Sequence, residues 1–81
     1  MYKEIYNEMT HRYGKSTLTK KELANELSIS INTINSYIVK GINLPNYKKL
    51  GNAKNSRVVF PIVEVAKYIS HTQKVFNNSF Q

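Results

Sequence analysis

Apolar residues recur at steps of three and four over residues 2–13, which is the spacing of one helix face. They are Tyr2, Ile5, Tyr6, Met9 and Tyr13. Polar residues fill the positions between them, and Gly14 is a typical C-terminal stop. We therefore predict an N-terminal amphipathic helix, within residues 1–16, that packs either on the core of the domain or on a second subunit.

Two shorter helical patterns follow. Thr19 and Glu22 have the spacing of a capping box, and Leu23, Ala24 and Leu27 fall on one face behind it. Ser28 and Ile29 then form a turn. Ser30 is a good N-cap for a second helix, which Gly41 would end. The apolar residues of that second helix are Ile31, Ile34, Tyr37 and Ile38. Two short helices joined by about three residues are typical of a helix-turn-helix.

Beyond Gly41 the pattern changes to two short strand-like runs, at residues 47–50 and 57–60. The six residues between them are rich in turn formers, so we predict a β-hairpin. Pro61 suits the first turn of a last helix. Its inward stripe would close the core and consists of Ile62, Val65, Ala66 and Ile69. Residues 71–81 are mostly polar, with Phe76 and Phe80 interspersed, which predicts a frayed tail or a segment that folds on a partner.

Charge narrows the class of partner. The 81 residues carry 12 basic and 5 acidic side chains, a net charge of +7, and no acid lies between Glu26 and Glu64. Such an excess of positive charge favours a polyanion as the binding partner: DNA, RNA or an acidic membrane surface. The longest apolar runs are too short to cross a bilayer, and the N-terminus lacks an apolar signal core. We expect a cytoplasmic protein without membrane association.

Catalytic and metal chemistry is not apparent. The chain has no cysteine, which excludes disulfides and Cys-ligated metal sites. His11 and His71 are far apart and have no acidic cluster near them, so surface histidines are the simpler interpretation. The five acids are all glutamates and form no close pair, and no glycine-rich phosphate loop occurs. We expect neither an enzyme nor a bound cofactor or metal.

The candidate binding residues lie on the second short helix and on the hairpin. Asparagine can bond adenine edges at two points, and Ser or Thr can bond bases or phosphates. The outward positions of that helix are Asn32, Thr33, Asn35, Ser36 and Lys40. The cations on the hairpin are Lys48, Lys49, Lys54 and Arg57. A solvated helix face in an asparagine-rich chain, and a surface hairpin kept soluble by lysines, are the alternative interpretations.

Residues 18–69 resemble the MerR-like winged helix-turn-helix of phage excisionases and AlpA-type regulators. The matching residues begin with the segments 18–24 (LTKKELA) and 27–30 (LSIS), then Thr33-Ile34, Lys40-Gly41 and Leu44-Pro45. They continue with Lys49-Leu50-Gly51, Arg57-Val58, Phe60, Glu64-Val65 and Tyr68-Ile69. The resemblance implies a mainly α fold with a small β-hairpin: a winged helix-turn-helix at residues 17–70, preceded by the extra helix.

In that family the second helix enters the major groove and the wing lies on the neighbouring groove or backbone. The resemblance adds Ser30 to the reading helix and Asn55 to the wing, and we expect Lys20 and Lys21 to contact the DNA backbone. Ile31 and Ser36 stand where family members often carry arginine, which shifts the expected affinity towards the wing. The chain after Ile69 is shorter than the dimerisation helix of MerR regulators, so we expect no small-molecule effector.

The leading hypothesis is a sequence-specific double-stranded DNA-binding protein of a phage or mobile element. It would act as a transcriptional regulator or as an excisionase, with self-association on tandem sites or an integrase as further partners. The alternative is a protein–protein interaction module that uses the same fold without specific DNA binding. An RNA-binding role is a weaker rival, because most tyrosines fall on inward stripes and no stacking surface is obvious.

Overall fold

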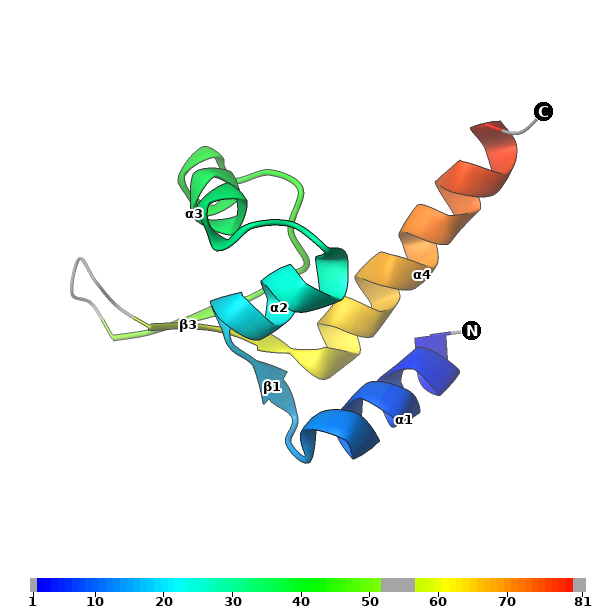
Figure 1. Ribbon diagram of the computed structural model, residues 1–81, viewed down its shortest axis with the longest axis horizontal. Helices are drawn as coiled ribbons and strands as arrows, with labels where there is room; N and C mark the ends of the chain where they lie inside the picture. Colours follow the sequence, from blue (N-terminus) through cyan, green and yellow to red (C-terminus); the bar gives the residue numbers. More distant parts are fainter. Residues whose placement is uncertain (1, 52–56, 80–81) are drawn as a thin grey trace.

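The computed structural model describes residues 2–51 and 57–79, and the side chains of these as far as His71. In order along the chain, the elements are α1 (Tyr2–Tyr13), β1 (Thr17–Leu18), α2 (Lys20–Leu27), α3 (Ile31–Lys40), β2 (Lys48–Leu50), β3 (Arg57–Pro61) and α4 (Ile62–Ser79). The described part is therefore mainly helical, with a small three-stranded antiparallel sheet (Figure 1).

The ends of the central helices follow from local side-chain chemistry, as predicted. The Thr19 hydroxyl accepts the backbone N–H of Glu22, and the Glu22 carboxylate accepts the N–H of Thr19, so the capping box at the start of α2 is complete. The Ser30 hydroxyl caps α3 by accepting the N–H of Thr33. Ser28 and Gly41 end α2 and α3 with left-handed backbone, at φ values of 59° and 69°. A left-handed φ suits glycine, which has no Cβ to clash.

The sheet has the order β1-β3-β2, and its first strand was not predicted. Thr17 pairs with Pro61 and Leu18 with Phe60, both antiparallel. The expectation that Pro61 opens the last helix was wrong by one residue: Pro61 ends β3, and α4 starts at Ile62. The pairing continues past the proline, which has no N–H, because the Ile62 N–H donates to the Ser16 carbonyl over 2.8 Å.

A single core joins the elements. Its fully buried side chains come from α1, β1, α2, α3, β3 and α4, and include Met9, Leu18, Leu23, Ile34, Phe60, Ile62 and Val65. The predicted inward faces of the helices are confirmed except at Ile31, which is 43% exposed because it is the first residue of α3 and has no core side chain over it. Helix α1 packs along α4, so of the two predicted alternatives for this helix the core position is the one observed.

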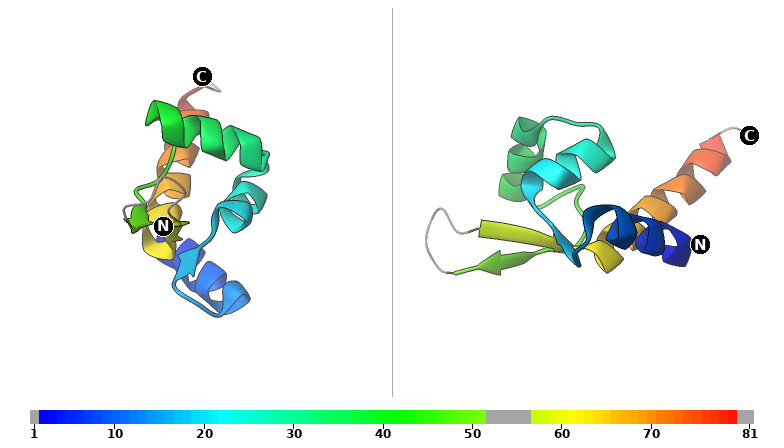
Figure 2. Two further views of the ribbon diagram at one scale, coloured as in Figure 1. Left: turned by 90° about the vertical axis from the view of Figure 1, so that its left-hand side faces the viewer. Right: turned by 60° about the horizontal axis from the view of Figure 1, so that its bottom comes forward.

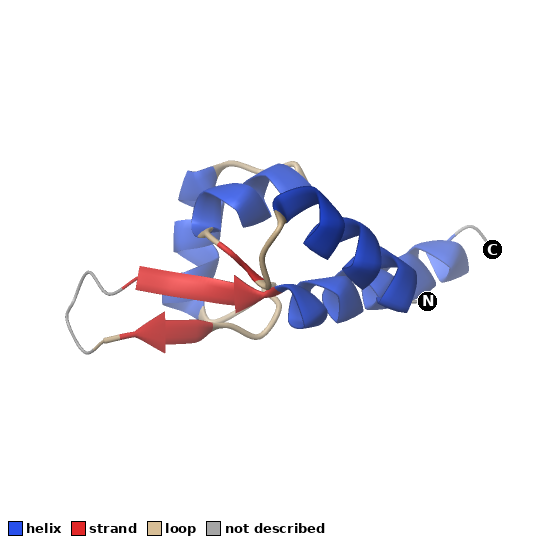
Figure 3. Cartoon of the chain, turned by 90° about the horizontal axis from the view of Figure 1, so that it is seen from below, coloured by secondary structure: helices blue, strands red, loops and turns tan. Residues whose placement is uncertain are grey.

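The two ends of the molecule are formed by different elements. Helix α3 and the β2–β3 hairpin lie at one end, and both chain termini lie at the other, where α1 and the far half of α4 run (Figures 1 and 3). Helix α4 continues to Ser79, so the backbone beyond Ser70 is helical up to that residue where the sequence predicted a polar tail.

Candidate nucleic-acid interface

Helix α3 presents its long side at the end of the molecule where the hairpin also projects (Figure 2, left). Its inward face is apolar, with Ile34 buried and Tyr37 and Ile38 half-buried. Asn32, Asn35 and Lys40 are exposed as predicted, and Ser36 is half-buried at the edge of the same face. Three of the five predicted outward residues of this helix are therefore exposed, and the other two, Thr33 and Ser36, are half-buried.

Two of the predicted reading residues are engaged at the helix start. The Ser30 hydroxyl accepts the N–H of Thr33 and lies 2.9 Å from the Thr33 hydroxyl. A hydroxyl that caps a helix already uses part of its hydrogen-bonding capacity. Ser30 and Thr33 thus have a structural role that accounts for their presence without any ligand.

Asn35 is linked to the preceding helix. The Lys20 ammonium, at the first position of α2, donates to the Asn35 side-chain carbonyl over 2.9 Å. Because an ammonium group can only donate, the amide oxygen must face Lys20, which leaves the amide N–H₂ to point elsewhere. The oxygen keeps a second lone pair. Lys21 is exposed beside Lys20 and has no such contact with α3.

The strand register divides the hairpin cations between the two faces of the sheet. Residues directly opposite in an antiparallel pair project to the same face. Lys49 lies opposite the buried Val58, on the side that the core covers, whereas Lys48 and Arg57 belong to the other face. All three are exposed. Lys54 and Asn55, the remaining predicted wing residues, lie outside the described residues.

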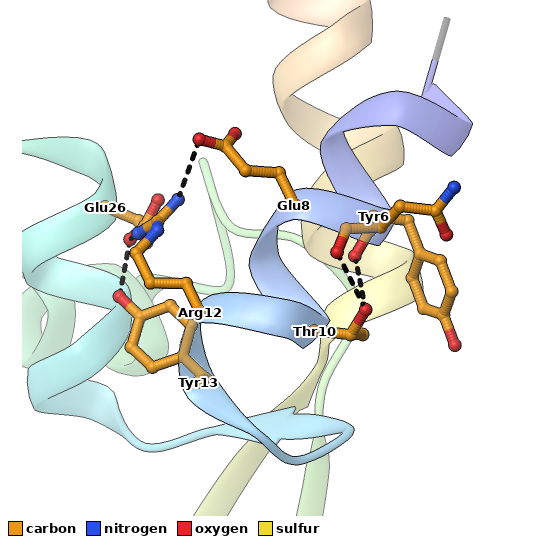
Figure 4. Close-up of polar contacts among 7 residues, drawn as sticks. Tyr6, Glu8, Thr10, Arg12, Tyr13 and Glu26 are labelled. Atoms are coloured by element: carbon orange, nitrogen blue, oxygen red, sulfur yellow. Dashed lines mark hydrogen bonds and ion pairs between the residues drawn. The ribbon is translucent and has the colours of Figure 1, made fainter.

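Acidic side chains are paired at a distance from this surface. The described ion pairs join Arg12 to Glu8 and Glu26, and Lys15 to Glu22 over 2.9 Å. Figure 4 shows Arg12 and Tyr13 of α1 meeting at the Glu26 carboxylate of α2. Within the described ranges, no ion pair occupies the four cations of the α3 and hairpin surface, which are Lys40, Lys48, Lys49 and Arg57.

The ionisation of two groups reflects these contacts. Burial and the hydrogen bond to Glu26 raise the pKa of Tyr13 to about 12. The Lys15 ammonium and the Thr19 N–H lower the pKa of Glu22 below its usual range. Both groups belong to the junction between α1 and α2, which sequence reasoning did not identify because Arg12 and Glu26 come from different helices.

One residue of the α3 surface was missed altogether. Val39 is 86% exposed, the largest exposure among the large apolar side chains that the structure describes as exposed. The others are Ile31, Ile42 and Leu50. All four come from α3, from the residue just beyond Gly41 and from β2, so exposed apolar groups gather on the same elements as the unpaired cations. The sequence does carry a signal for this: on a helix with 3.6 residues per turn, Val39 falls outside the face formed by Ile34, Tyr37 and Ile38.

The described ranges 2–51 and 57–79 bear on two further features, metal-ligating clusters and membrane-spanning helices. These ranges contain no group of three or more His, Cys, Asp or Glu side chains placed to hold a metal ion. No described helix is both long and apolar enough to cross a membrane. No protein-family profile matches the chain, and no curated protein or solved structure matches it either.

Proposed function

We propose that the chain binds double-stranded DNA through a winged helix-turn-helix formed by α2, α3 and the β2–β3 hairpin. The observation that carries the proposal is the shared position of two features at one end of the molecule: the polar exposed face of α3 and the unpaired cations of the hairpin. An α-helix fits the major groove, and lysine and arginine pair with the phosphates that flank it.

The division of labour follows from the side chains. The exposed amides of Asn32 and Asn35 can bond base edges but add no charge. The hairpin carries cations on both of its faces, with Lys49 on one side and Lys48 and Arg57 on the other. A groove of DNA has phosphates along both walls, so a strand pair charged on both faces matches it. The hairpin then supplies most of the affinity, and α3 supplies the base preference.

Salt dependence tests this function. Each phosphate contact that a protein neutralises makes the logarithm of the affinity fall by about 0.9 per logarithmic unit of salt on B-form DNA. We expect binding of a random-sequence duplex to weaken at least a thousandfold between about 50 and about 200 mM salt if about six or more contacts form. Fluorescence anisotropy with a labelled duplex measures it. A flat response, or no binding at low salt, contradicts the proposal.

Matched variants of basic residues locate the contact. Lys49→Ala and Arg57→Ala should each weaken binding to all sequences and lower the salt slope by about one unit. Lys3→Ala removes the same charge from the exposed surface of α1, at the opposite end of the molecule, and should leave the slope unchanged. If Lys3→Ala lowered the slope as much as Lys49→Ala, the binding would reflect net charge alone and the proposed surface would be wrong.

Two biological roles fit such a unit: a transcriptional regulator at a promoter and an excisionase that bends DNA for an integrase. A recombination assay with an integrase separates them, since only the excisionase role depends on the integrase. Affinity from one small module is modest, so binding to tandem or paired sites through self-association is part of the proposal. A phage or other mobile element is the source that the resemblance implies.

A second candidate is a protein–protein interaction module, favoured by one observation. An open groove of about 610 Å³ lies between the end of α2, α3 and α4. Its apolar lining includes Leu27, Ile29, Tyr37, Tyr68 and Ile69. Apolar docking has little salt dependence, so the anisotropy series above distinguishes the two functions.

A further inference from the structure

Val39 lies on the polar face of α3, close to the C-terminal end of the helix. Steps of three and four place it next to Asn35 and Ser36, one helical turn further along the same side. It is 86% exposed, whereas the other apolar residues in this part of the helix face the core. A single exposed apolar side chain is ordinary on a protein surface, so its exposure alone indicates nothing. Its position among uncharged hydrogen-bonding side chains is the informative feature.

The chemistry of DNA offers one partner for such a side chain. Among the base edges in the major groove, only thymine carries an apolar group, the C5-methyl, and apolar side chains read thymine by contacting it. Every other base edge there presents donors and acceptors. A valine one turn beyond asparagine and serine therefore complements a thymine next to bases that are read through hydrogen bonds.

The spacing matches neighbouring base pairs. Side chains four residues apart on a helix lie roughly 5–6 Å from each other at their Cβ atoms. Bases on one DNA strand follow each other at about 3.4 Å along the axis. Asn35 and Val39 can thus contact positions one or two base pairs apart, and an asparagine amide suits adenine best.

On this basis, and resting on the proposed DNA-binding function, we propose that Val39 is a specificity-determining residue that packs on the C5-methyl group of a thymine, one or two base pairs from an adenine bonded by Asn35. Val39 contributes discrimination between thymine and bases without the methyl group. Asn35 and Val39 together then give the protein a preference for A·T pairs.

Deoxyuridine in place of thymine tests this, because it removes only the methyl group and keeps the base pairing. A duplex is first selected from a random library with the full-length protein, and each thymine is then replaced singly. We expect one position at which the replacement weakens wild-type binding about fourfold, which corresponds to about 0.8 kcal/mol for burial of one such carbon group. Val39→Ala should bind the two duplexes equally well.

Ile42→Ala is the matched control. Ile42 is another exposed aliphatic residue, 45% exposed and just beyond α3, and its variant should keep the fourfold difference. Alanine favours helix more than valine does, so Val39→Ala is expected to fold, which circular dichroism verifies. The inference is overturned if the selected site lacks thymine, if every thymine tolerates the change, or if Val39→Ala retains the difference. In those outcomes DNA binding itself still stands. If no duplex is selected, the proposed function fails, and the inference fails with it.

Discussion

At the scale of single residues, the structure separates side chains that the sequence treated alike. Ser30 and Thr33 serve the start of α3, whereas Asn32 and Asn35 are exposed with hydrogen-bonding capacity to spare. The contact between Lys20 and Asn35 joins residues of two helices and could not be seen in the sequence. It gives Lys20 two tasks in the proposed complex: it adds a positive charge near the DNA backbone, and it sets the orientation of the Asn35 amide.

A double-mutant cycle measures the second task. We expect Asn35→Ala to cost on the order of 1–3 kcal/mol at the selected site and to relax base preference. Lys20→Ala should both weaken binding and relax the same preference, because the amide loses its fixed orientation. When Asn35 is already alanine, the effect of Lys20→Ala on binding should be smaller, which corresponds to a coupling free energy of about 0.5–3 kcal/mol between the two residues.

Lys21→Ala controls for charge in this cycle. Lys21 is the exposed neighbour of Lys20 and has no hydrogen bond to α3, so its effect should add to that of Asn35→Ala and appear only in the salt slope. Affinities for the selected duplex and for single-base changes in it provide the measurement. Full additivity of Lys20→Ala with Asn35→Ala would mean that the contact does not position the amide.

At the scale of elements, what the sequence predicted well is what local chemistry determines. The Thr19–Glu22 box, the Ser30 cap and the stop at Gly41 involve residues a few positions apart, and all appear where expected. Strand β1 was missed because a strand of two residues is too short to show an alternation of apolar and polar positions. Its pairing partners in β3 also lie far along the chain. The role of Pro61 depends on that same pairing. The end of α4 was predicted from a change in polarity, which does not by itself stop a helix.

The capping box makes the stability of α2 depend on pH. The pKa of Glu22 is lowered in the folded state by Lys15 and by the Thr19 N–H. A carboxyl whose folded pKa is depressed stabilises the fold above its unfolded pKa and loses that contribution as the pH falls through the folded value. Wild type should therefore exceed Glu22→Gln in unfolding free energy at neutral pH. The gap should close below the ordinary value of 4.5.

Urea unfolding of both proteins between about pH 7 and about pH 3 measures this gap. Glutamine keeps an oxygen for the Thr19 N–H, so the comparison isolates the charge. Lys15→Ala removes the largest cause of the shift and should reduce the pH dependence in the same way. A constant difference between wild type and Glu22→Gln over the whole range would contradict the assignment.

At the scale of the whole molecule, the described ion pairs and the proposed binding surface belong to different parts of the fold. Every acidic residue lies on α1, α2 or α4, and the described ion pairs tie the start of the chain to α2. The chain between α3 and β3 has basic side chains and no acid to neutralise them. This arrangement concentrates positive potential where the hairpin projects, whereas the core is shared by side chains of α1, β1, α2, α3, β3 and α4.

Met9 tests whether α1 is part of that core. It is 1% exposed and belongs to the same buried cluster as Leu18 and Phe60. Met9→Ala should lower the unfolding free energy by about 2–5 kcal/mol, a large share of the roughly 5–15 kcal/mol typical of whole domains. The exposed Asn7, on the same helix, provides the control: Asn7→Ala should stay within about 0.5 kcal/mol of wild type.

Circular dichroism and tyrosine fluorescence should give coincident urea transitions. Met9→Leu preserves the volume and should leave DNA affinity unchanged, since α3 and the hairpin lie at the other end. Two separate transitions, or equal effects of Met9→Ala and Asn7→Ala, would mean that α1 folds apart from the core.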